Sequence, residues 1–214
     1  MAELKEHRIL EHVLKNAVCG DPQSVVDSID QYCRQKEWAM NVGDEKGLIL
    51  DQIVKETDPL VLLELGTYLG YSATRIARLL KSGARLLTVE MNPVHAEVAK
   101  KIIEFAGVQD KVQVLEGSTQ DIIPKLKAEY GIKNIDLVFI DHYGERYKPD
   151  TQLLEDLSLL RKGSVLVADN VGFSSSAEFL DHVRTSGRYD CTNYPAHLEY
   201  SNKPDAVEKA VFIG

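Results

Sequence analysis

The sequence has few cysteines and no long apolar segment, and both absences exclude classes of protein. Its three cysteines, Cys19, Cys33 and Cys191, are widely spaced and include no C-x-x-C pair. An odd number at such spacing provides neither a disulfide framework nor a zinc site. No apolar run approaches the roughly 20 residues that cross a bilayer, and the charged N-terminus lacks the apolar core of a signal peptide. We therefore expect a cytoplasmic protein with no membrane span.

Excess positive charge is also missing. The 25 Lys and Arg residues are outnumbered by 33 Asp and Glu residues, which gives a formal net charge of -8. Nucleic-acid binding depends on clustered Lys and Arg, so this balance argues against DNA or RNA as a partner. Nothing in the composition indicates an obligate protein partner either. With 44% hydrophobic and 27% charged residues, the chain is typical of one globular domain covering residues 1–214.

The spacing of apolar residues divides the chain into two parts. Residues 1–57 show helical spacing, and Asp21-Pro22 is typical of a helix start, with aspartate as the cap and proline in the first turn. From residue 58 onward, short apolar runs typical of buried strands alternate with helical patterns. We predict strands at 60–65, 84–90, 111–117, 135–141 and 164–170, and helices at 71–81, 93–106, 119–129 and 149–161. Residues 58–214 are therefore expected to form an α/β sheet core, mostly parallel and covered by helices on both faces.

The C-terminal segment has a different pattern. Residues 189–200 and 206–214 indicate two further strands that form an antiparallel hairpin at one edge of the sheet. In sheets of this kind, ligands bind beyond the carboxyl ends of the parallel strands. The residues that follow each strand are therefore the candidates for function.

The first strand ends in a glycine turn preceded by a carboxylate. Gly66 and Gly70 surround the turn, where backbone amides and Ser72 can approach a ligand closely. A nicotinamide dehydrogenase would show G-x-G-x-x-G, whereas the spacing here is G-x-x-x-G. Glu64 would repel a pyrophosphate but attract the ammonium and sulfonium groups of S-adenosylmethionine. A packing turn without a ligand and a dehydrogenase site are the alternatives.

Two residues at the end of the second strand suit a nucleoside. Glu90 can accept hydrogen bonds from both ribose hydroxyls, which NAD and S-adenosylmethionine share. Met91 can pack on a flat adenine, although a single methionine is more often part of a core. These residues favour a nucleoside ligand without separating the two cofactors.

Oxygen-bearing side chains follow the strands at 135–141 and 164–170. Asp141-His142 ends the first of them, and Asp169-Asn170 ends the second. Three oxygen ligands at neighbouring strand ends suit a hard cation, and so few ligands favour Mg²⁺, which retains room for water and substrate. Zinc is not expected, because His142 has no thiolate or second histidine at motif spacing. Ordinary surface turns are the alternative interpretation.

Together these motifs resemble the catechol O-methyltransferase family. The matching segments, in the family's order and spacing, are Trp38–Gly43, Glu64–Gly66, Gly70–Ser72, Glu90–Pro93, Asp141-His142, Ala168–Val171 and Leu198–Tyr200. The resemblance implies a Rossmann-like methyltransferase fold, whose seven-stranded sheet has one antiparallel strand and whose N-terminal helices, here within 1–57, cover the cofactor. It also implies Mg²⁺-dependent methyl transfer from S-adenosylmethionine to one hydroxyl of a small-molecule catechol.

The resemblance assigns roles to individual residues. The Mg²⁺ ligands would be Asp141, Asp169 and Asn170, with both catechol oxygens completing the coordination. Asp141 and Glu199 would serve catalysis, the latter by reaching the hydroxyl that is not methylated. The substrate pocket would include Trp38, Met40, Asn170, Leu198 and Glu199. The cofactor would contact Val42, Glu64, Gly66, Tyr68, Tyr71, Ser72, Glu90, Met91, Ser118, Thr119, Gln120, Asp141, His142 and Tyr143.

The sequence departs from the family at the residue that takes the proton. The family has Asp-His-Trp-Lys, with the lysine as general base, whereas this chain has Tyr143-Gly144 after Asp141-His142. Tyr143 keeps an aromatic ring over the adenine, but Gly144 removes a base of a kind that typically contributes about 10²–10⁴-fold. The family's proline after Asp-Asn is also replaced, by the run Gly172-Phe173-Ser174. Lys148 could serve as the base only if this loop bends differently.

Three functions fit this departure. The chain methylates catechols with the metal supplying most of the activation, methylates a different acceptor, or binds cofactor and metal without catalysis. The retained Asp-Asp-Asn set and Glu199 favour the first two, because a binding protein needs neither. A lysine placed at Gly144 is expected to raise any catechol turnover.

Overall fold

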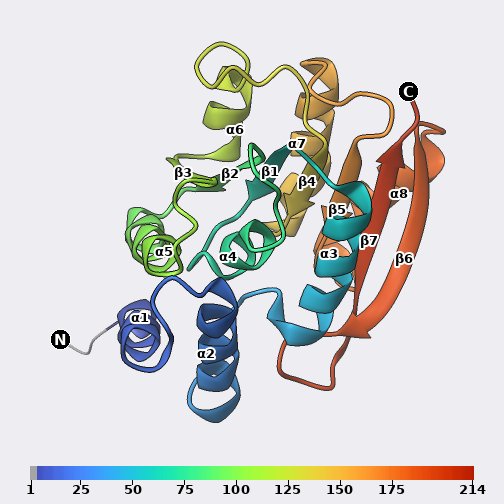
Figure 1. The fold of residues 1–214 in the computed structure, drawn as a ribbon. Helices are drawn as coiled ribbons and strands as arrows, with labels where there is room; N and C mark the ends of the chain where they lie inside the picture. The colour runs from blue at the N-terminus through green and yellow to red at the C-terminus, as the bar shows by residue number, and fades with distance from the viewer. Residues whose placement is uncertain (1–3) are drawn as a thin grey trace.

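The computed structural model describes residues 4–214, which form an α/β fold (Figure 1). The helices are α1 (Lys5–Asn16), α2 (Pro22–Gln35), α3 (Gly43–Thr57), α4 (Tyr71–Ala77), α5 (Pro93–Phe105), α6 (Thr119–Ile122), α7 (Gly144–Asp156) and α8 (Ala177–Thr185), with 3-10 turns η1 (Ile123–Lys125) and η2 (Ser174–Ser176). The strands are β1 (Val61–Leu65), β2 (Arg85–Glu90), β3 (Val112–Glu116), β4 (Leu137–Ile140), β5 (Val165–Ala168), β6 (Tyr189–His197) and β7 (Pro204–Phe212).

The seven strands form one sheet in the order β3-β2-β1-β4-β5-β7-β6. The strands β1 to β5 pair in parallel, and β7 runs antiparallel to both of its neighbours, β5 and β6. The predicted α/β class, the single antiparallel strand and the edge hairpin are therefore confirmed. The sheet order reverses at β1, which places β1 and β4 side by side at its centre and leaves β3 and β6 at its edges.

The central strands β1, β2, β4 and β5 are buried on both faces, as their continuous apolar sequences predict, whereas the edge strands β3 and β6 are partly exposed. Along β1, Leu62 faces a core shared with α1 to α5, whereas Leu63 and Leu65 face a second core shared with α6 to α8. This alternation follows from the two-residue period of a strand. The sheet thus separates two apolar cores, and each is closed by its own layer of helices.

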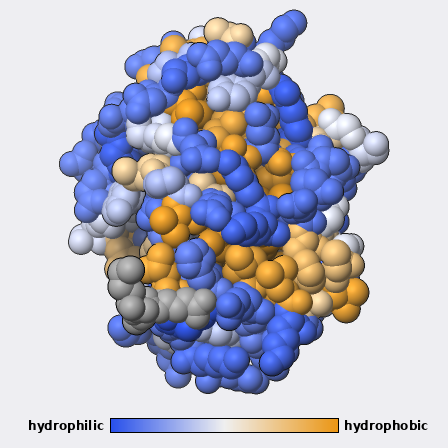
Figure 2. Space-filling view, turned by 90° about the vertical axis from the view of Figure 1, so that its left-hand side faces the viewer, coloured by the Kyte–Doolittle hydropathy of each residue, from blue (hydrophilic) through white to orange (hydrophobic). Residues whose placement is uncertain are grey.

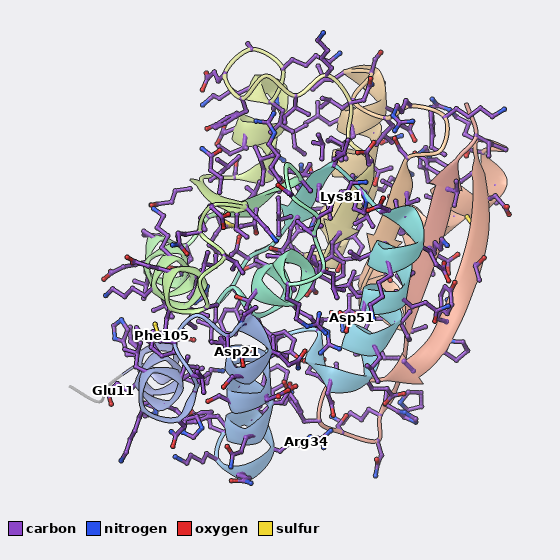
Figure 3. All side chains as sticks on the ribbon, in the orientation of Figure 1. Glu11, Asp21, Arg34, Asp51, Lys81 and Phe105 are labelled. Atoms are coloured by element: carbon purple, nitrogen blue, oxygen red, sulfur yellow. The ribbon has the colours of Figure 1, made fainter. Side chains whose placement is uncertain are left out.

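The N-terminal helices stack on the first of these cores. Asp21 caps α2 by accepting hydrogen bonds from the amides of Gln23 and Ser24 at 3.0 and 3.1 Å, which confirms the predicted start at Pro22. Figure 1 shows α1 and α2 next to each other, beside α5 and α4, and these pairs are in contact. Asp51 of α3, labelled in Figure 3, forms a buried bidentate pair with Arg75 of α4 at 3.0 and 2.8 Å.

Three helical predictions needed correction. The helix expected at 119–129 is one turn of α6 followed by the 3-10 turn η1, because Pro124 cannot continue the hydrogen-bond ladder. The helix expected at 149–161 begins at Gly144, carries Pro149 inside it and ends at Asp156. The helix α8 was not predicted, since it follows the serine-rich turn η2 and has only nine residues.

The helices of residues 4–214 include none with the length and apolar character of a membrane span. One face of the molecule is shown in Figure 2, where apolar residues gather in a central band between hydrophilic margins. The cytoplasmic location and the single domain over 1–214 stay predictions.

Candidate active site

The main pocket opens at the carboxyl ends of the parallel strands and has a volume of about 570 Å³. Its lining residues come from the turns after β1 to β5, together with Met40, Asn41 and Glu199. Five consecutive strand ends therefore converge on one cavity, at the position where open α/β sheets bind their ligands.

Most of the residues predicted from the sequence line this cavity. They are Met40, Gly66, Tyr68, Glu90, Met91, Ser118, Thr119, Gln120, Asp141, His142, Tyr143, Asn170 and Glu199. Val42 and Leu198 instead line a smaller polar pocket of about 270 Å³, which shares Glu199 with the main one. The remaining predicted residues lie outside the linings: Glu64, Tyr71, Ser72 and Asp169 are buried, and Trp38 is 47% exposed.

The turn after β1 depends on glycine. Gly66 has a φ of 97°, and a Cβ atom on it would lie 2.9 Å from the carbonyl carbon of Asp141. Both the left-handed backbone and this close approach require a residue without a side chain. Gly66 thereby lets the β1 turn and the end of β4 meet at the floor of the pocket.

Glu64 is a fully buried carboxyl at the end of β1. Burial raises its pKa to about 7, and the hydrogen bonds from Ser72 and Thr88 offset only part of this effect. A carboxylate in this position is costly in the absence of a positive partner. The site therefore favours a ligand that brings positive charge to the β1 turn.

Glu90 is fixed by backbone amides at the end of β2. Its Oε2 accepts from the amide of Tyr68 at 2.8 Å, and its Oε1 accepts from the amide of Asn92 at 2.8 Å. These bonds hold the carboxylate at the wall of the pocket. The arrangement suits a ligand with neighbouring hydroxyl groups.

Asp150, a buried carboxylate on α7 that the sequence did not single out, supports the pocket wall formed by the turns after β3 and β4. Asp150 accepts from the Thr119 hydroxyl at 2.6 Å and from Arg146 at 2.6 Å, and it lies 2.8 Å from Nε2 of His142. The ring of His142 stacks on Tyr147 at 5.3 Å between centroids. Asp150 thus fixes the β3–α6 and β4–α7 turns relative to each other.

Acidic side chains gather where β4 and β5 end. Burial and the nearby charge of Asp169 raise the pKa of Asp141 well above its ordinary value, and burial raises the pKa of Asp169 to about 6. The ammonium of Lys46 lies 2.8 Å from Asp169 Oδ1, 2.8 Å from Asp205 Oδ2 and 3.5 Å from Glu199 Oε2. Burial opposes the charge of Lys46, but the carboxylates of Asp169 and Asp205 outweigh it and raise its pKa.

These residues fit a hard cation. The side-chain amide nitrogen of Asn170 donates to Asp205 at 2.9 Å, which leaves its oxygen available to a metal beside Asp141 and Asp169. Within residues 4–214, no three His, Cys, Asp or Glu side chains are grouped to hold a metal by themselves. Two carboxylates and one amide oxygen would therefore need further oxygen ligands, which is how Mg²⁺ is usually bound.

The structure leaves no space for a side chain at position 144. Gly144 begins α7, and a Cβ atom on it would lie 2.8 Å from Cβ of Ser175 in the turn η2. Lys148, the alternative base, lies 3.5 Å from Glu178 of α8 and outside the pocket lining. A lysine therefore cannot simply be restored at Gly144, and the expected gain in turnover requires Ser175 to change as well.

Lys46 and Asp205 were missed by the sequence analysis. A pattern was present for Lys46, since it shares the buried face of α3 with Leu50, Ile53 and Val54 at helical spacing. A charged residue at such a position indicates a buried partner. For Asp205 the sequence offered no comparable sign, because it begins a strand that is otherwise ordinary.

Comparison with known proteins decides the family. A family model described as O-methyltransferase matches residues 18–186. The chain belongs to this O-methyltransferase family. It is 54% identical to the catechol O-methyltransferase of Bos taurus over all of this chain and 79% of that protein. It is 52% identical to catechol O-methyltransferase B of Danio rerio over 98% of this chain and 80% of that one.

A solved structure agrees with this assignment. The O-methyltransferase from Bacillus cereus in complex with SAH has a TM-score of 0.74 and 25% identity, and the match covers 96% of this chain and 90% of that one. The Rossmann-like methyltransferase fold and the resemblance to catechol O-methyltransferases are confirmed. The chain is an S-adenosylmethionine-dependent O-methyltransferase, and the dehydrogenase hypothesis no longer stands.

Proposed function

We propose that this O-methyltransferase transfers the methyl group of S-adenosylmethionine to one hydroxyl of a catechol, with Mg²⁺ bound at Asp141, Asp169 and Asn170. The observation that carries the proposal is the gathering of oxygen-bearing side chains where β4 and β5 end: Asp141 and Asn170 line the pocket, and the buried Asp169 is close enough to raise the pKa of Asp141. The relatives named catechol O-methyltransferase match the whole chain and support the same acceptor.

The cofactor occupies the part of the pocket next to β1 and β2. Glu64 attracts its ammonium group, and Glu90 accepts from its ribose hydroxyls. Met91 and Tyr143, 62% and 68% exposed, provide apolar surfaces at the rim for the adenine. The other proposed contacts are Val42, Gly66, Tyr68, Tyr71, Ser72, Ser118, Thr119, Gln120, Asp141 and His142.

The acceptor lies between the metal ligands and the N-terminal segment. Bound Mg²⁺ supplies positive charge that lowers the pKa of a catechol hydroxyl. Glu199, whose pKa is raised by burial, accepts a hydrogen bond from the hydroxyl that is not methylated. Trp38, Met40 and Leu198 would hold the ring and so orient the reacting oxygen toward the methyl carbon.

The proton of the reacting hydroxyl passes to solvent in this proposal. Gly144 offers no base, and Lys148 is paired with Glu178. With Mg²⁺ held by Asp141, Asp169 and Asn170, the pKa of the hydroxyl would fall and a dedicated base would be less necessary. Turnover below that of enzymes with the lysine is the expected cost.

The test is methylation of a simple catechol by S-adenosylmethionine, with Mg²⁺ or with EDTA, followed by mass spectrometry of the product. We expect product that requires Mg²⁺ and that falls at least 100-fold in Asp141→Asn, in line with the loss of a group that acts in the transition state. Asp181→Asn, on the exposed surface of α8, is the matched control. Equal product in EDTA would contradict the metal assignment.

A second candidate is methylation of a different acceptor. It is favoured by the contact between Gly144 and Ser175, because the turn η2 fills the space expected for the lysine and reshapes that wall. Product with a non-catechol hydroxyl compound, but none with catechol, would support it. Binding of S-adenosylhomocysteine without product from any acceptor would support a non-catalytic role.

A further inference from the structure

One histidine of the main pocket has no role in the proposed function. His95 lies in the first turn of α5 and lines the cavity together with Tyr68, Glu90 and Asn92. Its side chain is only 19% exposed. Most of the imidazole is therefore held inside the wall of the cofactor pocket.

The two ring nitrogens of His95 face two different carboxylates. Nδ1 lies 3.8 Å from Oε1 of Glu90, at the end of β2, and Nε2 lies 3.9 Å from Oε1 of Glu6, on α1. The ring also meets Tyr68 edge-on, with centroids 4.9 Å apart. The Tyr68 hydroxyl donates to the same Glu6 oxygen at 3.1 Å. One imidazole thus connects the first helix with the strand end that carries Glu90.

Asn92 fixes which ring nitrogen carries the proton. Its Oδ1 accepts from the amide of Val94 at 2.9 Å, as the N-cap of α5, so its amide nitrogen is the atom turned toward His95. That nitrogen lies 3.3 Å from Nε2. Because Nε2 accepts there, the proton of a neutral ring sits on Nδ1, where it faces Glu90. The N–H of a neutral ring therefore faces Glu90, whereas Nε2 has no proton for Glu6. The link to α1 then runs through the edge-on contact with Tyr68, whose hydroxyl donates to Glu6.

We propose that His95 is a positioning residue of the cofactor site, which adds an electrostatic contact to the backbone amides that hold the Glu90 carboxylate and couples its position to the docking of α1 through Tyr68 and Glu6. The inference rests on the proposed role of Glu90 at the cofactor ribose. It goes further, since cofactor affinity then depends on a contact with the N-terminal helix. His95 acts through Glu90 and takes no part in the chemical step.

The test measures the affinity of the full-length protein for S-adenosylhomocysteine by calorimetry. We expect His95→Leu to weaken binding by about threefold to tenfold, since the contact to Glu90 at 3.8 Å is longer than a hydrogen bond and acts through electrostatics. His95→Gln keeps an N–H donor and should recover part of the loss. Glu6→Gln should weaken binding less, and adding it to His95→Leu should produce no further loss, because both changes break the same connection.

A matched control exists in the same chain. His182 on α8 lies 3.0 Å from Glu155, with its side chain 15% exposed, and lines neither pocket. His182→Leu should leave the affinity unchanged. In steady-state assays, His95→Leu should raise the KM for S-adenosylmethionine and leave kcat within twofold, whereas a general folding defect would lower the active fraction and kcat together.

Variants of Glu90 and His95 distinguish the role of His95 from the proposed cofactor site. Unchanged affinity in a folded His95→Leu protein, when Glu90→Gln weakens binding, would overturn the role of His95 alone. Unchanged affinity in Glu90→Gln, or no binding by the unaltered protein, would overturn both this inference and the proposed cofactor site. Independent, additive losses in His95→Leu and Glu6→Gln would overturn the connection to α1.

Discussion

At the scale of single residues, the region where β4 and β5 end is distinguished by buried charged side chains. Lys46, Asp169 and Asp205 are all buried, and the ammonium of Lys46 pairs with both carboxylates. A buried ion pair contributes little net stability, yet removal of one partner is strongly destabilising. The buried cluster is therefore expected to add little net stability while being sensitive to the loss of any one member.

The first prediction concerns Glu64. Its folded pKa of about 7 exceeds the ordinary value of 4.5, so the folded protein binds more protons and loses stability as pH rises between these values. Glu64→Gln should abolish this slope and stabilise the ligand-free protein above pH 7 by on the order of 3 kcal/mol. Urea unfolding at pH 5 and pH 8 measures it, with the exposed Glu97→Gln as control. An equal loss of stability between pH 5 and pH 8 in the unaltered protein and in Glu64→Gln would contradict the raised pKa of Glu64.

The second prediction concerns Lys46. Lys46→Met leaves the carboxylates of Asp169 and Asp205 without their positive partner and should lower the free energy of unfolding by about 3–5 kcal/mol. The control is Lys101→Met, whose pair with Glu97 on the surface of α5 has side chains 51% and 61% exposed. That change should cost under about 1 kcal/mol. Equal effects of the two substitutions in chemical unfolding would argue against the buried cluster.

At the scale of elements, the start of α7 and the turn η2 are fitted to each other. Ser175 packs where a side chain at Gly144 would lie. We predict that Gly144→Lys alone destabilises the protein by about 1–3 kcal/mol, the usual cost of overpacking, and does not raise turnover. Gly144→Lys with Ser175→Gly should regain the stability and exceed the original turnover.

Thermal unfolding and catechol methylation rates check this pair of variants. The single change Ser175→Gly serves as the control, since it opens space without adding a base. A higher rate from Gly144→Lys alone would show that the turn η2 moves aside without a change at Ser175. An unchanged rate in the double variant would show that a base at this position does not limit turnover.

The elements that could be predicted from the sequence are those with strong local patterns. Asp21-Pro22 marks the start of α2, and the continuous apolar runs mark buried parallel strands. The start of α7 was hidden because Gly144 and Pro149 both disfavour a helix interior, so packing decides it. Likewise, Asp141 and Asn170 could be predicted because they follow strands in the sequence. Asp205 could not, because its place beside them depends on β7 pairing with β5, and the spacing of apolar residues does not predict the order of strands.

At the scale of the whole molecule, the pocket joins the N-terminal helices to the sheet. Met40 and Asn41 reach it from the segment between α2 and α3, and Glu6 reaches Tyr68 from α1. We predict that S-adenosylhomocysteine slows amide hydrogen exchange in α1 and in residues 36–42 at least tenfold, because Met40 and Asn41 line the pocket and Glu6 contacts the pocket residue Tyr68.

The control region for this measurement is α8, which packs on the other face of the sheet. Its exchange should change little. Equal slowing in α8 and α1 would indicate general stabilisation in place of covering by residues 1–57. No slowing in α1 would contradict both the covering role and the contact through Glu6.

The outermost strand of the sheet has a consequence for behaviour at high concentration. The edge strand β6 has nine residues, and unpaired backbone groups along such a strand can template the addition of another chain. Pro195, paired with Ala206, has no amide hydrogen to offer, and the exposed side chains of Asp190 and Asn193 disfavour stacking with a second copy. These features of β6 therefore disfavour edge-to-edge addition of a second copy when the protein is concentrated.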